Sequence, residues 1–165
     1  MRVFLIGFMG SGKSTVGRKL SSATGLNFID LDNYIRKKED KTINEIFDEK
    51  GEDYFRQTEH RLLNEIIEKD NFILSCGGGT PCFFDNISMM NKNGITIYLK
   101  MTVDAIYSRL SHSPDNRPLL KKIPGNKLRS YIENTLKERE EYYKMAHHTV
   151  DAINLKISSV VKLLG

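Results

Sequence analysis

The sequence predicts an α/β protein whose parallel sheet is covered by helices on both faces. Short apolar segments alternate along the chain with longer segments in which apolar residues recur at helical spacing. A glycine-rich turn follows the first apolar segment directly, as in a strand–turn–helix unit. No repeat or linker divides the 165 residues, so we expect a single domain over residues 1–165.

Five segments are expected to form strands. They are short, rich in apolar and branched residues, and bounded by glycine or polar residues, as strands buried on both faces tend to be. In chain order they are Val3–Ile6, the region around Phe28 and Ile29, Phe72–Ser75, Ile95–Leu99 and a final strand within residues 148–154.

The segments between the strands have helical spacing. In the longest of the early ones, Leu62, Leu63, Ile66 and Ile67 share one face. Gly25 is expected to end the first helix. The predicted helices are Lys13–Ala23, Ile43–Lys50, Asp53–Lys69, Val103–Leu110, Asn126–Met145 and Lys156–Leu164.

Composition excludes several classes of partner. Lys and Arg exceed Asp and Glu by 25 to 21, and no basic run or aromatic–basic pattern suggests nucleic-acid binding. No apolar stretch of the sequence approaches the roughly 20 residues that a membrane-spanning helix needs.

The two cysteines indicate a reducing compartment. Cys76 and Cys82 match no zinc spacing, so we expect reduced thiols in a cytoplasmic protein.

The pattern Gly7-x-x-x-x-Gly12-Lys13-Ser14 lies between the first strand and the first helix. Such glycines let backbone N–H groups converge on phosphate oxygens, at the positive end of the helix dipole. The lysine reaches the β- and γ-phosphates, and the serine hydroxyl is a ligand for Mg²⁺. A chance glycine-rich turn is the alternative, but the flanking strand and helix favour a nucleoside triphosphate site. The residues expected to bind it are Gly10, Ser11, Gly12, Lys13, Ser14 and Thr15.

The pattern alone does not distinguish hydrolysis from phosphoryl transfer. The guanine-binding string Asn-Lys-x-Asp is absent, and the chain is too short for most motor or helicase ATPases. Residues 112–124 contain three prolines and little periodicity, so we expect a mobile loop there. A short nucleotide-binding domain with a basic lid suits a small-molecule kinase, which must exclude water during transfer.

Asp30 and Asp32 follow the second strand, at the sheet edge where the glycine-rich turn lies. If this segment is extended, the two side chains point to opposite sides and have different roles. One would face Mg²⁺ through water, and the other would accept a hydrogen bond from a substrate hydroxyl and take its proton. The sequence leaves open the alternative that Asp32 caps a helix beginning near Asn33.

Further polar residues have two interpretations each. Arg56 and Glu59 share a helix face, which also suits an ordinary surface ion pair. The three residues Gly77–Gly79 indicate either close approach to the backbone or a bare turn. Arg117, in the expected lid, would stabilise a transferred phosphoryl group or be a solvated loop residue. Spacing does not distinguish Arg139 from the charged residues around it.

The chain resembles the shikimate kinases in six segments, in this order: GFMGSGKST, DLD, INEIFDEKGEDYFRQTE, ILSCGGG, NRPLL and KEREEYY. The likeness runs from Arg2 to the final helix. The first segment is shared by many enzymes, whereas the combination is far more specific. The resemblance implies a three-layer P-loop fold with a five-stranded parallel sheet. It also implies ATP- and Mg²⁺-dependent phosphorylation of the 3-hydroxyl of shikimate, in aromatic amino-acid biosynthesis, by a monomer.

The resemblance also implies individual roles. The residues that would bind shikimate are Asp32, Phe47, Phe55, Arg56, Gly78, Gly79 and Arg139. Asp32 would meet the hydroxyls, and the two arginines would hold the carboxylate with paired hydrogen bonds. The catalytic residues would be Lys13, Asp32 and Arg117, and Arg109 would join Arg117 in the ATP site. Ser14 would bind Mg²⁺, on which Asp30 and Glu59 would act through water. Acceptor-binding helices would span about 32–62.

The chain departs from the family at Thr80 and Pro81, where the family more often has small or branched residues. The proline should stiffen the backbone where the chain leaves the glycine turn.

Three other interpretations of the function stay open. A gluconate-type kinase would have no need of two carboxylate-binding arginines. A nucleoside monophosphate kinase typically has an Asp-Gly-aromatic-Pro-Arg string, which is absent. The third is an ATP-binding module without catalytic activity.

Overall fold

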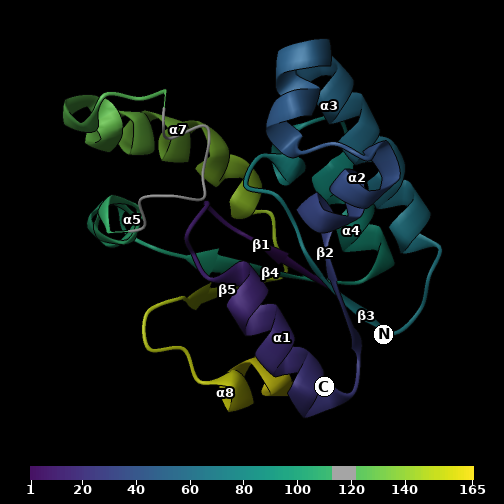
Figure 1. Ribbon diagram of the computed structural model, residues 1–165. Coiled ribbons are helices and arrows are strands. Elements are labelled where there is room, and N and C mark those ends of the chain that lie inside the picture. Colours follow the sequence, from purple (N-terminus) through teal and green to yellow (C-terminus); the bar gives the residue numbers. More distant parts are fainter. Residues whose placement is uncertain (113–121) are drawn as a thin grey trace.

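The structure is a computed structural model that describes residues 1–112 and 122–165. A five-stranded sheet lies between two layers of helices, which confirms the predicted α/β fold (Figure 1). The strands are β1 (Arg2–Ile6), β2 (Asn27–Asp30), β3 (Phe72–Ser75), β4 (Ile95–Lys100) and β5 (His148–Asp151). The α-helices are α1 (Lys13–Thr24), α2 (Leu31–Glu39), α3 (Ile43–Ile67), α4 (Asn86–Asn93), α5 (Val103–Ser111), α7 (Leu128–Tyr143) and α8 (Ile157–Lys162). Two short 3₁₀ helices are η1 (Thr80–Cys82) and η2 (Gly125–Lys127).

The sheet order is β2-β3-β1-β4-β5, and every pairing is parallel. All carboxyl ends therefore share one edge, where ligands of open α/β sheets bind. The register pairs Ser75 at the end of β3 with Leu5 on one side and Asp30 on the other. The turns that follow β1, β2 and β3 are thus neighbours in space.

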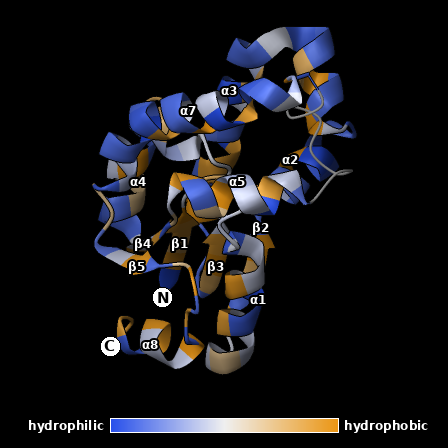
Figure 2. Ribbon diagram, turned by 90° about the vertical axis from the view of Figure 1, so that its left-hand side faces the viewer, coloured by the Kyte–Doolittle hydropathy of each residue, from blue (hydrophilic) through white to orange (hydrophobic). Residues whose placement is uncertain are grey.

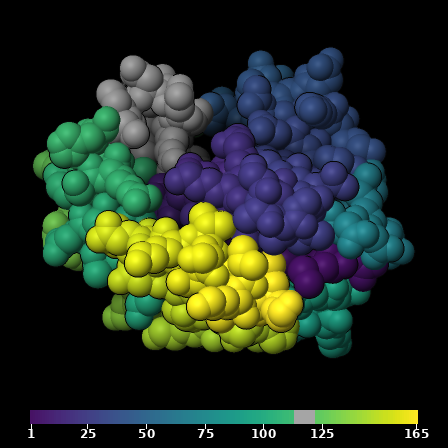
Figure 3. All heavy atoms as spheres, turned by 90° about the horizontal axis from the view of Figure 1, so that it is seen from below, coloured from purple at the N-terminus to yellow at the C-terminus, as the bar shows by residue number. Residues whose placement is uncertain are grey.

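Helices cover both faces because the three central strands, β3, β1 and β4, are largely apolar and buried. In the central strand β1, Val3–Ile6 is fully buried. Helices α1 and α8 lie on one face, and α3, α4 and α7 on the other (Figure 1). Figure 2 shows the hydrophobic strands between helices whose outer sides are largely hydrophilic. From below, the C-terminal residues and α8 lie directly against α1 (Figure 3).

The sequence does not predict α4 or η1, and it offers a helix at the position of α2 only as an alternative. Helix α2 begins at Leu31, and the Asp30 side chain accepts from Asn33 N at 3.1 Å as its N-cap. Both the expectation of an extended segment through Asp32 and the alternative that Asp32 is the cap are therefore wrong. Asp30 already supplies the cap, so Asp32 lies in the first turn of α2.

The remaining helices follow the prediction closely. Gly25, in the left-handed conformation, ends α1. The break predicted between two helices over residues 43–69 is confirmed, because Gly51 interrupts α3 with a non-helical conformation at φ 82° and ψ 172°. The long late helix begins at Leu128, after η2.

The described part of the chain contains no helix that is long and apolar enough to cross a membrane. Most of the predicted lid, Arg117 included, lies outside the described residues.

Candidate active site

The turn between β1 and α1 presents backbone N–H groups at the carboxyl edge of the sheet. Gly10 (φ 79°) and Gly12 (φ 89°) adopt the left-handed region that side chains other than glycine rarely enter. Ser11 N donates to Phe8 O at 3.1 Å and closes the turn. Gly12 is the N-cap of α1, so the first N–H groups of that helix have no carbonyl partner within the helix and lie at the positive end of its dipole, which favours an anion.

Two cations contact the carbonyls of this turn. Lys13 is nearly buried, and its Nζ donates to the carbonyls of Gly7 at 2.8 Å and Phe8 at 3.0 Å. Arg109 reaches across from α5 and donates to Gly10 O at 2.9 Å. The Ser11 hydroxyl is buried and has no hydrogen-bond partner among the described residues. Two cations, the N–H groups at the start of α1 and the buried Ser11 hydroxyl all suit the binding of a polyphosphate.

Oxygen atoms from three elements meet beside this turn. Ser14 Oγ donates to Asp30 Oδ2 at 2.8 Å and lies 3.2 Å from Ser75 Oγ. Within residues 1–112 and 122–165, no cluster of three or more His, Cys, Asp or Glu could hold a metal alone. Mg²⁺ in phosphate sites usually takes one or two protein oxygens besides water and substrate phosphates. Ser14 and Asp30 therefore fit Mg²⁺ that arrives with a nucleotide. Ser75 was not predicted, although its register beside Asp30 places it here.

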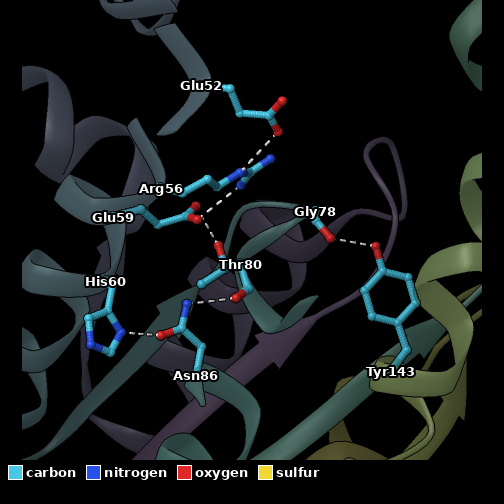
Figure 4. A network of polar contacts seen from close by, with 8 residues as sticks. All are labelled: Glu52, Arg56, Glu59, His60, Gly78, Thr80, Asn86 and Tyr143. Carbon is cyan, nitrogen blue, oxygen red and sulfur yellow. Dashed lines mark hydrogen bonds and ion pairs between the residues drawn. The ribbon is translucent and has the colours of Figure 1, made fainter. Parts of the chain in front are cut away.

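Arg56 and Glu59 form a buried ion pair, so the surface interpretation is wrong. Arg56 Nη1 donates to Glu59 Oε1 at 2.9 Å, and the two residues are 9% and 1% exposed. Burial raises the pKa of Glu59, although the neighbouring Arg56 and the Thr80 hydroxyl oppose that shift. Thr80 donates to Oε2 at 2.8 Å (Figure 4). Both oxygens of Glu59 therefore accept a hydrogen bond within the protein, which holds its carboxylate against Arg56.

Aromatic rings and a glycine enclose the Arg56 guanidinium. Its Cζ lies 4.1 Å from the ring centre of Phe83 and 5.1 Å from that of Phe55, which packs on Phe47 at 4.7 Å. A Cβ on Gly79 would lie 2.6 Å from Nη2, closer than atoms can approach. The glycine therefore leaves room for the arginine, and the interpretation of residues 77–79 as a bare turn is wrong.

Arg139 occupies the neighbouring position along the glycine turn. A Cβ on Gly78 would lie 3.0 Å from Arg139 Nη1, and the guanidinium also lies 5.7 Å from the Phe8 ring centre. One turn later on α7, the buried Tyr143 donates its hydroxyl to Gly78 O at 2.6 Å (Figure 4). Burial raises the pKa of Tyr143, which keeps it a donor. The turn is thus held by α7 on one side and α3 on the other.

Asp32 lies beside Gly77, the first of the three glycines. A Cβ on Gly77 would be 3.4 Å from Asp32 Oδ1 and 3.2 Å from Glu59 Oε2. A carboxylate and two guanidinium groups therefore surround one glycine turn, beside the phosphate-binding turn. A groove of about 420 Å³ adjoins it. Its lining residues are Glu52, Cys82, Phe83, Thr135, Glu138, Arg139, Glu141 and Tyr142. The arrangement suits a small molecule with a carboxylate and a hydroxyl near a γ-phosphate.

Known proteins share this architecture and a large part of this sequence. The family model for shikimate kinase matches residues 9–164. A shikimate kinase from Parabacteroides distasonis is 44% identical over 160 residues, which cover 97% of this chain and 92% of the relative. The crystal structure of shikimate kinase from Bacteroides thetaiotaomicron has a TM-score of 0.91 at 37% identity, covering 99% of this chain and 96% of that one. A shikimate kinase from Acinetobacter baumannii, solved in complex with shikimate, has a TM-score of 0.88 at 32% identity, covering 98% and 91%. The chain belongs to the shikimate kinase family.

Proposed function

We propose that this protein is a shikimate kinase, which transfers the γ-phosphoryl group of ATP to the 3-hydroxyl of shikimate on the route to chorismate and the aromatic amino acids. The observation that carries the proposal is the pair Arg56 and Arg139 at adjacent glycines, beside a phosphate-binding turn. Two guanidinium groups converging there suit a substrate carboxylate. Family membership, and the relative solved with shikimate, support the same substrate.

On the donor side, Gly10–Thr15 would hold the phosphates of ATP. Lys13 Nζ, which now donates to two carbonyls of the turn, is within reach of phosphate oxygens bound there. Arg109 would border the nucleotide next to Gly10. Mg²⁺ on Ser14, with Asp30 acting through water, would offset charge on the β- and γ-phosphates. Arg117 would approach the γ-phosphate from the lid.

On the acceptor side, Arg56 and Arg139 would hold the carboxylate of shikimate against Gly78 and Gly79. Asp32 would accept a hydrogen bond from the 3-hydroxyl and so orient its oxygen toward the γ-phosphorus. The transition state of phosphoryl transfer is loose, so orientation contributes more than proton removal. Phe47 and Phe55 would form the apolar wall beside the ring.

The test is ADP formation from ATP and Mg²⁺ with shikimate, gluconate and AMP at matched concentrations. We expect strong stimulation by shikimate alone. Stimulation by gluconate would support the gluconate-type alternative, and ADP release indifferent to every acceptor would support an ATP-binding module. Either result would remove the roles of Asp32, Arg56 and Arg139 while leaving the phosphate-binding turn intact.

We further infer a single kinase domain over residues 1–165 that acts as a monomer without nucleic acid. The free thiols of Cys76 and Cys82 agree with a reducing compartment such as the cytoplasm. Size-exclusion chromatography with light scattering would test the oligomeric state, and a mass near 18.9 kDa is expected.

Gly79→Ala is expected to weaken shikimate binding while leaving the fold intact. Gly79 has φ −91° and ψ −10°, which alanine adopts freely, so only the new methyl group matters. It would displace the end of the Arg56 side chain, which lies 2.6 Å from the Cβ position. We expect KM for shikimate to rise on the order of tenfold, because a hydrogen bond to a charged group contributes about 1.5–3 kcal/mol.

Gly125→Ala is the matched control, because none of the described residues beyond its chain neighbours lies within 4 Å of that Cβ position. Steady-state kinetics should show no change in either KM for the control, and no change in KM for ATP with Gly79→Ala. A Gly79→Ala enzyme with wild-type KM for shikimate would contradict the placement of Arg56 at the carboxylate.

A further inference from the structure

Thr80 links the glycine turn to two helices. It is fully buried at the start of η1, directly after Gly79. Its hydroxyl donates to Glu59 Oε2 on α3 at 2.8 Å, and its carbonyl accepts from Asn86 Nδ2 on α4 at 2.8 Å. One residue is thus hydrogen-bonded through its side chain to one helix and through its backbone to another.

The network continues from α4 back to α3. Asn86 is fully buried, and since its Nδ2 faces Thr80, its Oδ1 faces His60 Nδ1 at 2.6 Å. His60 follows Glu59 directly on α3, so the contacts form a closed loop (Figure 4). Asn64 Nδ2 lies 3.3 Å from His60 Nε2, which leaves Nδ1 as the ring donor to Asn86. A closed loop of this kind holds Thr80 from both sides.

The Thr80 hydroxyl matters because it acts on a carboxylate that is almost completely buried. Glu59 is 1% exposed, and a buried carboxylate requires donors on its oxygens to stay charged and in place. Arg56 supplies the donor to Oε1, and Thr80 supplies the donor to Oε2. Without the hydroxyl, Oε2 would lose that donor, and the carboxylate would be free to rotate or to bind a proton.

Thr80 also acts on the Arg56 guanidinium through the backbone of Gly79. The residue before Thr80 is Gly79, whose backbone lies directly against Arg56. Anchoring Thr80 between Glu59 and Asn86 therefore fixes both the buried acceptor of Arg56, Glu59, and the glycine backbone against which the guanidinium packs.

We propose that Thr80 is a positioning residue for substrate binding, which acts through Glu59 and Gly79 to hold the Arg56 guanidinium in the orientation that accepts the carboxylate. The proposal rests on the proposed function for the identity of the carboxylate.

The test compares Thr80→Val, which removes the hydroxyl at nearly constant shape, with Thr80→Ser, which keeps it. Thr80→Val is expected to raise KM for shikimate by five- to twentyfold and to change kcat and KM for ATP by less than twofold. Thr80→Ser is expected to restore most of the loss. If Thr80→Val does not fold, Thr80→Ala removes the same hydroxyl without a new contact.

Thr96→Val is the matched control. Thr96 is also fully buried, and its hydroxyl donates to Asn91 Oδ1 at 2.6 Å, but it lies near the amino end of β4, at the edge away from the site. We expect it to lower stability without changing either KM. A purely structural role for Thr80 would make Thr80→Val and Thr96→Val behave alike.

A readout without substrate separates this inference from the proposed function. ¹⁵N NMR measures how fast the Arg56 guanidinium rotates about its Nε–Cζ bond, with the signal assigned by its loss in Arg56→Lys. We expect faster rotation in Thr80→Val and wild-type rotation in Thr96→Val. Faster rotation in an enzyme that does not use shikimate would overturn the proposed function and leave the positioning role standing. Unchanged rotation in Thr80→Val would overturn the positioning role, whatever the substrate.

Discussion

Lys13→Ala is expected to lower kcat by about 10²–10³-fold, the usual loss when one preorganised donor to developing charge is removed. Nζ lies against two carbonyls of the phosphate-binding turn, and a phosphate bound there would meet it directly. The fold should survive, because Phe8 O keeps the donor Ser11 N and the core lies elsewhere. Coupled measurement of ADP release, with circular dichroism to confirm folding, provides the test.

Lys19→Ala is the control on the same helix, because Lys19 is exposed and lies outside the site. We expect wild-type turnover for this variant. A folded Lys13→Ala enzyme that keeps more than half of wild-type turnover would show that Lys13 does not act on the phosphates.

Arg139→Ala is expected to impair the use of shikimate far more than the binding of ATP, by about 2–4 kcal/mol, because the substrate carboxylate loses a charged partner. That loss corresponds to a rise of roughly 30- to 1,000-fold in KM for shikimate. The Arg139 side chain rests on Gly78 and near Phe8, so its removal leaves the Arg56–Glu59 pair intact. Steady-state kinetics with each substrate varied in turn provides the measurement.

Arg129→Ala is the matched control on the same helix. Arg129 pairs with Asp104 and Glu133 at the surface, where ion pairs contribute little. We expect small effects on both KM values. Equal losses for shikimate and ATP in Arg139→Ala would refute its assignment to the carboxylate.

Much of the fold could be predicted because its signals are local. Short segments containing apolar or branched residues predicted all five strands, and Gly25 predicted the end of α1. The phosphate-binding turn could also be predicted, because its residues are adjacent in the sequence and their spacing follows from backbone geometry. The arginines that border the acceptor site required the family resemblance, since nothing local distinguishes Arg139 from its charged neighbours.

The supporting contacts could not be predicted because they join residues far apart in the chain. Tyr143 meets Gly78 across 65 residues, and Thr80 meets Glu59 across 21. The role of Asp30 was also hidden, because one carboxylate both caps α2 and accepts from Ser14. Sequence spacing describes neighbours on one element, whereas these contacts depend on how strands and helices pack.

The central claim is that the phosphoryl group of ATP passes to the 3-hydroxyl of shikimate. NMR of the product formed from ATP, Mg²⁺ and shikimate tests it most directly, because coupling between phosphorus and the ring proton at carbon 3 locates the new bond. We predict one phosphate monoester, at that carbon, formed in step with ADP. Phosphate released only as the free inorganic ion, or bonded at another hydroxyl, would contradict the account.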